Sequence, residues 1–223
     1  MKNLLYVFCF LFFISCNKKN DKTAILEKGI SLELAELRKQ QVSGVLYDLD
    51  FKIPEEKTNP IASKLLLEVS INNLKNDLIL DFNEDKSYLK SLKVNGKNSE
   101  IKHEKEHLII DKKLLNSGNN SIEIFFNAGE KSLNRNDEFL YTLLVPDRAS
   151  TLFPCFDQPD IKAKYKLRIT APKDWKVLCG GFEESAIEID GFTEHIFAKT
   201  DLMSTYLFSF VAGKFTEKTK NPG

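Results

Sequence analysis

The five residues His103-Glu104-Lys105-Glu106-His107 spell HExxH, a pattern in which two histidines can bind one zinc ion. That chemistry needs a helix, because positions i and i+4 then place both imidazoles on one face, with the glutamate beside a zinc-bound water. Here VNGKNSEIK precedes the pattern and LIID follows it, and both favour a turn and strands. In a single strand the two histidines would lie about 13 Å apart, too far for one ion. We therefore expect a solvated, charged hairpin tip that holds no metal.

No other set of residues forms a recognisable catalytic pattern. The sequence has no GxSxG, no P-loop, no CxxC and no GxGxxG after a strand. The third histidine, His195, lies in the strand-like EHIFAK and is interpreted as an ordinary strand residue. With 32 basic and 32 acidic residues the chain has no net charge, which argues against nucleic acid as a partner. The composition, 42% hydrophobic, is that of a folded protein with a core.

Residues 1–15 are typical of an export signal. A basic start is followed by the apolar run LLYVFCFLFFIS, which is too short to span a bilayer. The run ends at Ser15-Cys16, which resembles the lipobox of bacterial lipoproteins, where the cysteine is acylated and becomes the N-terminus. Each CH₂ of an acyl chain adds about 0.8 kcal/mol of membrane affinity. We expect an exported lipoprotein held at the cell envelope, on its periplasmic or outer-surface face, through Cys16. An ordinary cleaved signal with a coincidental cysteine is the alternative.

Beyond the signal, one short helix precedes a long series of strands. Ser31 is a candidate N-cap, and Leu34 and Leu37 are spaced for one face of a helix over 31–41. From Gly44 the hydrophobic period changes to two, and short strands follow between turn signals such as Asn95-Gly96, which favours a type I′ hairpin. A short turn is expected around 113–116. The predicted fold class is all-β, an antiparallel β-sandwich with one N-terminal helix.

The predicted parts are the signal (1–15), the lipidated cysteine, polar tether and helix (16–43), the β domain (44–216) and a polar end (217–223). Cys155 and Cys179 are the two cysteines left in the folded part. They could form a disulfide outside the cytosol or remain two buried free thiols.

One stretch of the β domain resembles a known family, the zinc aminopeptidases of the aminopeptidase N type, peptidase family M1. It reads Phe153-Pro154-Cys155-Phe156-Asp157-Gln158-Pro159, then Lys162-Ala163, then Ala171-Pro172-Lys173-Asp174-Trp175. The resemblance extends over about residues 42–216 and implies that family's N-terminal domain, a saddle-shaped all-β unit. We interpret Pro154, Cys155, Phe156, Asp157 and Pro159 as a fold signature: the prolines bracket a buried turn in which Asp157 accepts backbone N–H bonds.

The resemblance also implies which functional residues this chain lacks. The family's GxMEN motif and its helical HExxH belong to a catalytic domain that follows, where zinc is expected. The family's third zinc ligand, a glutamate nineteen residues after the second histidine, corresponds here to Phe126. The N-terminal domain's own Gln or Glu, which helps to bind the substrate's amino group, corresponds to Val145, and a second Gln to Leu143. We therefore assign no catalytic, substrate-binding or metal residue and no cofactor to this chain.

Two functions remain open from the sequence. The first is the N-terminal part of an exported zinc aminopeptidase, whose partners are its own catalytic domain, peptide substrates through that domain, and the membrane. The second is a stand-alone β lipoprotein that acts as a binding or scaffold module. Whether the protein is an enzyme depends on which of the two is correct.

The sequence predicts acylation at Cys16. Labelling of cells with a clickable fatty acid should mark the protein, and Cys16→Ser should abolish the label because the thiol is the acceptor. Cys9→Ser, inside the signal, is the matched control and should leave the label in the mature protein. Undiminished labelling of Cys16→Ser would contradict the lipobox interpretation.

Overall fold

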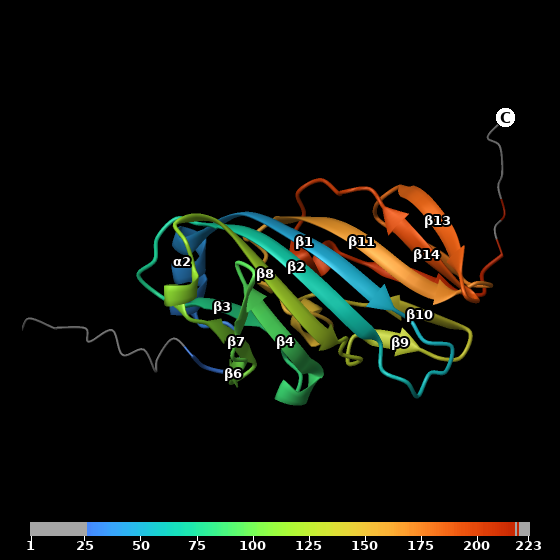
Figure 1. The fold of residues 1–223 in the computed structure, drawn as a ribbon, viewed down its shortest axis with the longest axis horizontal. Coiled ribbons are helices and arrows are strands. Elements are labelled where there is room, and N and C mark those ends of the chain that lie inside the picture. The colour runs from blue at the N-terminus through green and yellow to red at the C-terminus, as the bar shows by residue number, and fades with distance from the viewer. Residues whose placement is uncertain (1–25, 217, 219–223) are drawn as a thin grey trace, which may run out of the picture.

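The computed structural model describes residues 26–216 and 218, so the export signal and Cys16 lie outside the described residues. The described chain is built almost entirely of strands (Figure 1). Its elements are α2 (Leu32–Gln41), β1 (Val42–Lys52), β2 (Ala62–Ile71), β3 (Leu78–Asp81), β4 (Leu89–Val94), β5 (Lys97–Ser99), β6 (Lys102–Glu104), β7 (His107–Ile110), β8 (Gly118–Asn127), β9 (Leu133–Arg135), β10 (Phe139–Thr142), β11 (Ala163–Pro172), β12 (Lys176–Cys179), β13 (Glu183–Ile189), β14 (Phe192–Phe197) and β15 (Phe210–Gly213). Short 3-10 turns lie at Lys86–Tyr88, Lys112–Leu114, Ala149–Thr151 and Thr205–Leu207. The all-β prediction is confirmed.

The largest sheet has eight strands in the order β13-β14-β11-β1-β2-β8-β4-β5. All its pairs are antiparallel except β1 with β11, which run parallel. The prediction of purely antiparallel strands is therefore wrong at this pair. In this parallel pair Tyr47 lies opposite Tyr165 and Phe51 opposite Ile169, so the buried side chains of both strands lie on the same face of the sheet.

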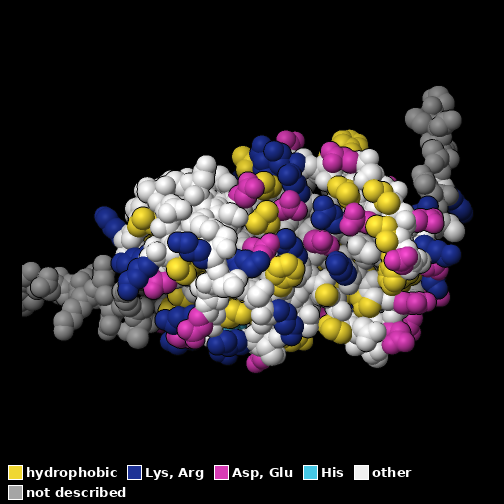
Figure 2. Space-filling view, viewed as in Figure 1, with side chains coloured by type: hydrophobic (Ala, Val, Ile, Leu, Met, Phe, Trp, Pro, Cys, Tyr) yellow, Lys and Arg dark blue, Asp and Glu magenta, His cyan; other side chains and the backbone are white. Residues whose placement is uncertain are grey.

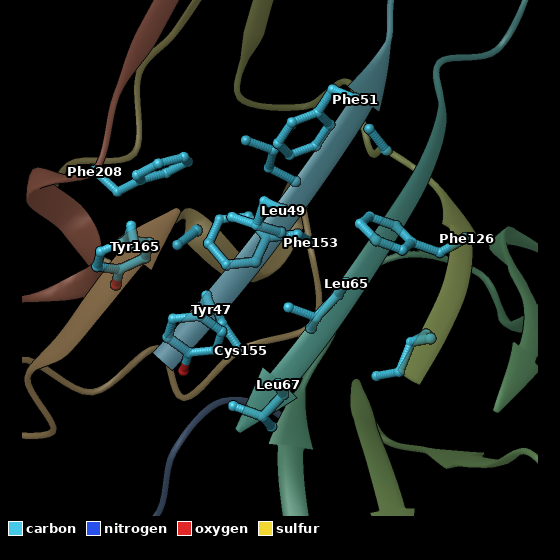
Figure 3. Packing of buried hydrophobic residues seen from close by; sticks show 14 of the residues in the cluster. Tyr47, Leu49, Phe51, Leu65, Leu67, Phe126, Phe153, Cys155, Tyr165 and Phe208 are labelled. Carbon is cyan, nitrogen blue, oxygen red and sulfur yellow. The ribbon is translucent and has the colours of Figure 1, made fainter. Parts of the chain in front are cut away.

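Two smaller sheets cover the inner face of the large one. They have the strand orders β12-β15-β10-β9 and β3-β7-β6. Phe51 of β1 meets Phe210 of β15 with ring centroids 5.1 Å apart, which joins the eight-stranded sheet to the four-stranded one. Phe82, directly after β3, meets Phe126 of β8 at 6.1 Å and joins the three-stranded sheet. Figure 3 shows Tyr47, Leu49 and Phe51 in a row along β1, inside this shared core.

Local signals account for the turns and the helix. Ser31 caps α2, since its side chain accepts a hydrogen bond from Leu34 N–H at 3.1 Å. Asn95 and Gly96 have φ of 51° and 77°, as a type I′ hairpin between β4 and β5 requires. The predicted turn near 113–116 is the 3-10 turn at Lys112–Leu114. In the part of the chain that is described, no helix has the length and apolar character to cross a membrane.

Charges of both signs cover the outward side of the large sheet. Glu123 on β8 pairs with Lys64 on β2 at 2.7 Å and with Lys93 on β4 at 3.0 Å, while Arg168 on β11 lies 3.6 Å from Asp50 on β1. Figure 2 shows basic and acidic side chains interspersed over the side of the molecule seen in Figure 1. This is the pattern of a sheet face that stays in water.

Neighbouring phenylalanines on β8 give a direct test of the core. Phe126 is 1% exposed and contacts Phe51 and Phe82, whereas Phe125 points outward and is 39% exposed. Phe126→Ala should lower the free energy of unfolding by about 3–5 kcal/mol. Phe125→Ala, the matched control, should lower it by about 1 kcal/mol or less. Urea unfolding followed by fluorescence measures both, and equal losses would contradict the assigned faces.

Candidate functional site

The HEKEH segment forms the β6–β7 hairpin, as predicted. Its turn residues Lys105 and Glu106 have φ of 49° and 71°, and Glu104 pairs with His107 across the hairpin. The expectation of a solvated tip is wrong at His107, which is only 1% exposed. Its burial comes from partners distant in sequence, which the local charge pattern could not indicate.

The two histidines bind different groups and do not converge on a common point. His103 Nε2 lies 2.8 Å from Phe82 O, and His107 Nδ1 lies 2.9 Å from Asp81 Oδ1. His107 Nε2 lies 2.8 Å from Glu27 O. Over residues 26–216 and 218, no group of three or more His, Cys, Asp or Glu side chains is placed to hold a metal ion. These residues do not fit a zinc site.

Asp81 is the centre of a buried polar cluster, and its carboxylate receives four hydrogen bonds. Arg38 of α2 binds it with two nitrogens, Nη1 to Oδ2 at 2.8 Å and Nη2 to Oδ1 at 2.6 Å. His107 adds the third bond, and the backbone N–H of Asp157 adds the fourth at 3.0 Å. Arg38 is fully buried and also donates from Nε to Ile79 O. One carboxylate thus connects α2, β3, β7 and the FPCFDQP segment.

The ionisation of the two aspartates differs because their partners differ. Burial raises the pKa of Asp81, but the Arg38 guanidinium and the His107 bond outweigh burial and hold the pKa below its usual range. Burial raises the pKa of Asp157, and bonds from Ser150 offset only part of that effect. The surroundings therefore favour the ionised form of Asp81, whereas burial disfavours the ionised form of Asp157.

The FPCFDQP segment lies in the interior beside this cluster. Cys155 and Asp81 form an antiparallel bridge, with Asp81 N–H donating to Cys155 O at 2.7 Å and Cys155 N–H donating back at 3.0 Å. Asp157 Oδ2 accepts from Ser150 N–H at 2.8 Å, the kind of bond expected of it. Phe156 N–H donates to the Tyr47 hydroxyl at 2.8 Å. Each contact is structural and none leaves a reactive group at a surface.

The remaining polar groups of the segment hold neighbouring elements. Gln158 donates to Ala35 O of α2 at 3.1 Å. Pro159 O accepts from the Ser204 hydroxyl at 2.6 Å, and Phe156 O accepts from the Thr205 hydroxyl at 3.0 Å. The signature therefore joins α2 to the turn before β15, and Pro154 is buried with it.

The two cysteines of the folded part are both free. Cys155 is fully buried, and burial raises the pKa of its thiol well above the usual value. Cys179 is half-buried, and burial raises its pKa as well. A thiol that stays protonated is a poor nucleophile, so neither cysteine has the character of a catalytic residue.

Leu143 and Val145 lie on the surface, 55% and 54% exposed, just beyond β10. They continue an apolar row on the outward side of the four-stranded sheet, where Leu178, Val211 and Tyr141 lie in register across three strands. Phe139 stacks on Tyr141 at 6.3 Å, and Phe215 lies 6.5 Å from Phe139. We call this surface the outer apolar face; its members are Phe139, Tyr141, Leu143, Val145, Leu178, Val211 and Phe215.

Sequence reasoning missed Arg38, Asp81 and the burial of His107. Arg38 is one of several charged residues in the short helix, and no local pattern there indicates its burial. The burial of Asp81 could have been inferred, because it is the one charged residue in the otherwise apolar strand LILD. All four residues of that strand are buried in the structure. A buried carboxylate requires a partner of opposite charge.

Comparison with known proteins assigns the chain to a family. A sequence model of the Peptidase M1 N-terminal domain matches residues 44–207. This chain belongs to that family. The resemblance first noted at the FPCFDQP segment is thereby confirmed.

The relatives of this M1 N-terminal domain are much longer proteins. Glutamyl aminopeptidase of Sus scrofa is 38% identical over 76 residues, 34% of this chain and 8% of that protein. Aminopeptidase N of Plutella xylostella is 36% identical over 76 residues, 32% of this chain and 8% of that protein. Crystal structures of an M1 zinc metallopeptidase from Deinococcus radiodurans and of Legionella pneumophila aminopeptidase A share the fold. The Deinococcus structure has a TM-score of 0.65 and 16% identity, and the match covers 78% of this chain and 42% of that chain. The Legionella structure has a TM-score of 0.69 and 25% identity, and the match covers 78% of this chain and 21% of that chain.

Removing the Asp81 carboxylate should leave a buried, unpaired Arg38. We expect Asp81→Asn to lower the free energy of unfolding at pH 7 by about 3–5 kcal/mol. Glu104→Gln is the matched control: it breaks the exposed Lys102–Glu104 pair, 3.8 Å apart, and should cost about 0–1 kcal/mol. Because the folded-state pKa of Asp81 is depressed, its stabilisation is present above the unfolded value of about 3.9 and is lost as the pH falls through the folded value.

The difference in unfolding free energy between wild type and Asp81→Asn should therefore be largest above about pH 5 and shrink below about pH 4. Urea titrations at a series of pH values measure this difference. Asp157, whose pKa is raised, also makes the unfolding free energy depend on pH, but it is present in both proteins and its effect largely cancels in the difference. A difference that is unchanged at low pH would show that the Asp81 charge does not stabilise the fold.

Proposed function

We propose that this M1 N-terminal domain is part of an exported zinc aminopeptidase that removes N-terminal amino acids from peptides, and that it is not catalytic by itself. The similarity to proteins named aminopeptidases supports the reaction class. The short share of each relative that the chain spans supports a role as one domain of a larger protein. Zinc, bound in the catalytic domain, would supply an activated water for hydrolysis of the peptide bond.

The observation that carries this proposal is the outer apolar face. Large apolar side chains gathered on one sheet face mark an interaction surface, because water disfavours such a patch. The outward side of the large sheet carries ion pairs between neighbouring strands, and its exposed apolar residues Phe125, Ile187 and Ile189 lie apart on two strands. Leu143 and Val145, which the resemblance places near the substrate's amino group, lie on this same apolar surface. We assign the outer apolar face to contact with the catalytic domain of the same protein.

The proposed place of action is the cell envelope. The apolar run before Ser15-Cys16 supports export and a lipid anchor at Cys16. The folded part needs no other membrane contact, since acyl chains on one cysteine would hold it at the surface. Peptide substrates would then be degraded outside the cytosol.

A stand-alone binding or scaffold lipoprotein is the alternative function. The gene separates the two: reading it beyond the codon for Gly223 should show a GxMEN motif and a helical HExxH with a distal glutamate, in frame or after a frameshift. A stop codon followed by unrelated sequence would favour the stand-alone module.

Charges placed on the outer apolar face should disrupt the proposed domain contact. In a chain that carries the catalytic domain, we expect the double variant Leu143→Glu, Leu178→Glu to lose about tenfold or more in hydrolysis of an aminoacyl reporter, because two carboxylates would be desolvated. Ile187→Glu with Ile189→Glu, two exposed positions on β13, is the matched control and should retain activity.

The isolated 223-residue chain is expected to release no reporter, and the double variant should barely change its stability because both leucines are exposed. Full activity of the double variant beside the catalytic domain would rule out this face as the contact.

A further inference from the structure

The β6–β7 hairpin holds the backbone that precedes α2. Lys105 donates from Nζ to Leu26 O at 2.7 Å, and His107 Nε2 lies 2.8 Å from Glu27 O. Lys28 Nζ lies 3.8 Å from Glu106 Oε1. Three consecutive residues of the N-terminal segment are thus contacted by three consecutive residues of the hairpin. The segment and the hairpin lie at the same end of the molecule, next to α2 (Figure 1).

Both ring nitrogens of His107 face groups that can only accept hydrogen bonds. Nδ1 faces the Asp81 carboxylate, whose pKa is held below its usual range, and Nε2 faces the Glu27 carbonyl. A neutral imidazole carries one proton and can satisfy only one of the two. Both ring nitrogens can therefore donate in this geometry only when the ring is doubly protonated, as an imidazolium.

We propose that residues 26–30 form a latch that is closed while the His107 ring carries both protons and opens when the ring loses one. The remaining proton stays on Nδ1, because the bond to an ionised carboxylate is the stronger of the two. Nε2 then presents a lone pair to the lone pairs of Glu27 O across 2.8 Å, and the two atoms repel. An unperturbed histidine changes charge between about pH 5 and 8, so pH is the variable that tests the latch.

The groups around His107 come from every element packed against it. Asp81 of β3 favours the imidazolium, and Arg38 of α2 opposes it but is already bound to Asp81 through two bonds. Glu106 on the hairpin pairs with Lys28 of the latch. The carboxylates of Asp147 and Asp157 line the same cavity of about 230 Å³ as His107. Acidic neighbours outnumber basic ones, which favours the closed latch at low pH.

Opening the latch would change access to this cavity and the length of the tether. Gly29 and Ile30 form part of the cavity wall beside Asp81 and Asp157. Their departure would expose these acidic groups to solvent. It would also free the five residues 26–30, which span about 17 Å when extended. This second consequence rests on the proposed lipid anchor at Cys16, whereas the latch itself does not.

Nuclear magnetic resonance on the 223-residue chain tests the latch without any substitution. Ring ¹⁵N shifts report the protonation of His107, and amide relaxation reports the order of Lys28 and Gly29. We expect order parameters near 0.85 while the ring is doubly protonated, falling below about 0.6 as the ring loses one proton. Constant order across the ring's titration would overturn the proposal, as would a ring that keeps both protons up to about pH 9.

A pair of substitutions separates the latch from general effects on the hairpin. His107→Gln cannot donate to both acceptors, so the order of residues 28 and 29 should become low and independent of pH. His103→Gln is the matched control, because His103 contacts Phe82 O and not the latch, and it should keep the wild-type pH dependence. Retained pH dependence in His107→Gln would overturn the assignment to this ring. Loss of activity in a longer protein would bear on the proposed aminopeptidase function and leave these measurements unaffected.

Discussion

The bidentate pair between Arg38 and Asp81 is the contact on which the surrounding structure depends. Both groups are buried, and each would be costly alone in the interior, since an unpaired buried charge loses its hydration without compensation. Because Asp81 also receives bonds from His107 and from Asp157 N–H, the helix, two strands of the small sheet and the FPCFDQP segment must be in place together. Such a cluster specifies one arrangement of these elements, where apolar contacts alone would tolerate sliding.

The FPCFDQP segment looks reactive in the sequence, with a cysteine, an aspartate and a glutamine in a row, yet its side chains serve the fold. Cys155 bridges Asp81 through the backbone, and its buried thiol stays protonated. Gln158 holds the helix, and Asp157 holds the turn that contains Ser150. A motif can therefore identify a family through the packing it enforces, without contributing a group to the reaction.

The elements that the sequence predicts correctly depend on local interactions. Ser31 bonds within its own helical turn, and Asn95-Gly96 sets its hairpin through its own φ angles. The features that it misses depend on distant partners: β1 pairs with β11 in parallel, and His107 is buried by Asp81 and by the backbone of Glu27. The charge-rich HEKEH pattern predicts a solvated turn, because the local sequence carries no information about the Asp81 carboxylate on β3. The predicted lipid site, Cys16, lies outside the described residues and stays a prediction.

The two broad sheets differ in what they present to the outside, and this difference bears on function. On the large sheet, Lys64 and Lys93 form ion pairs with Glu123 across neighbouring strands, and these charged side chains remain hydrated. On the four-stranded sheet, Leu178, Val211 and Tyr141 lie in one row with no charge between them. Leaving that row in water costs free energy in proportion to its apolar area, and only a second surface of similar character removes the cost. The proposed contact with a catalytic domain would account for this asymmetry, because one face would then meet solvent and the other would meet the rest of the protein.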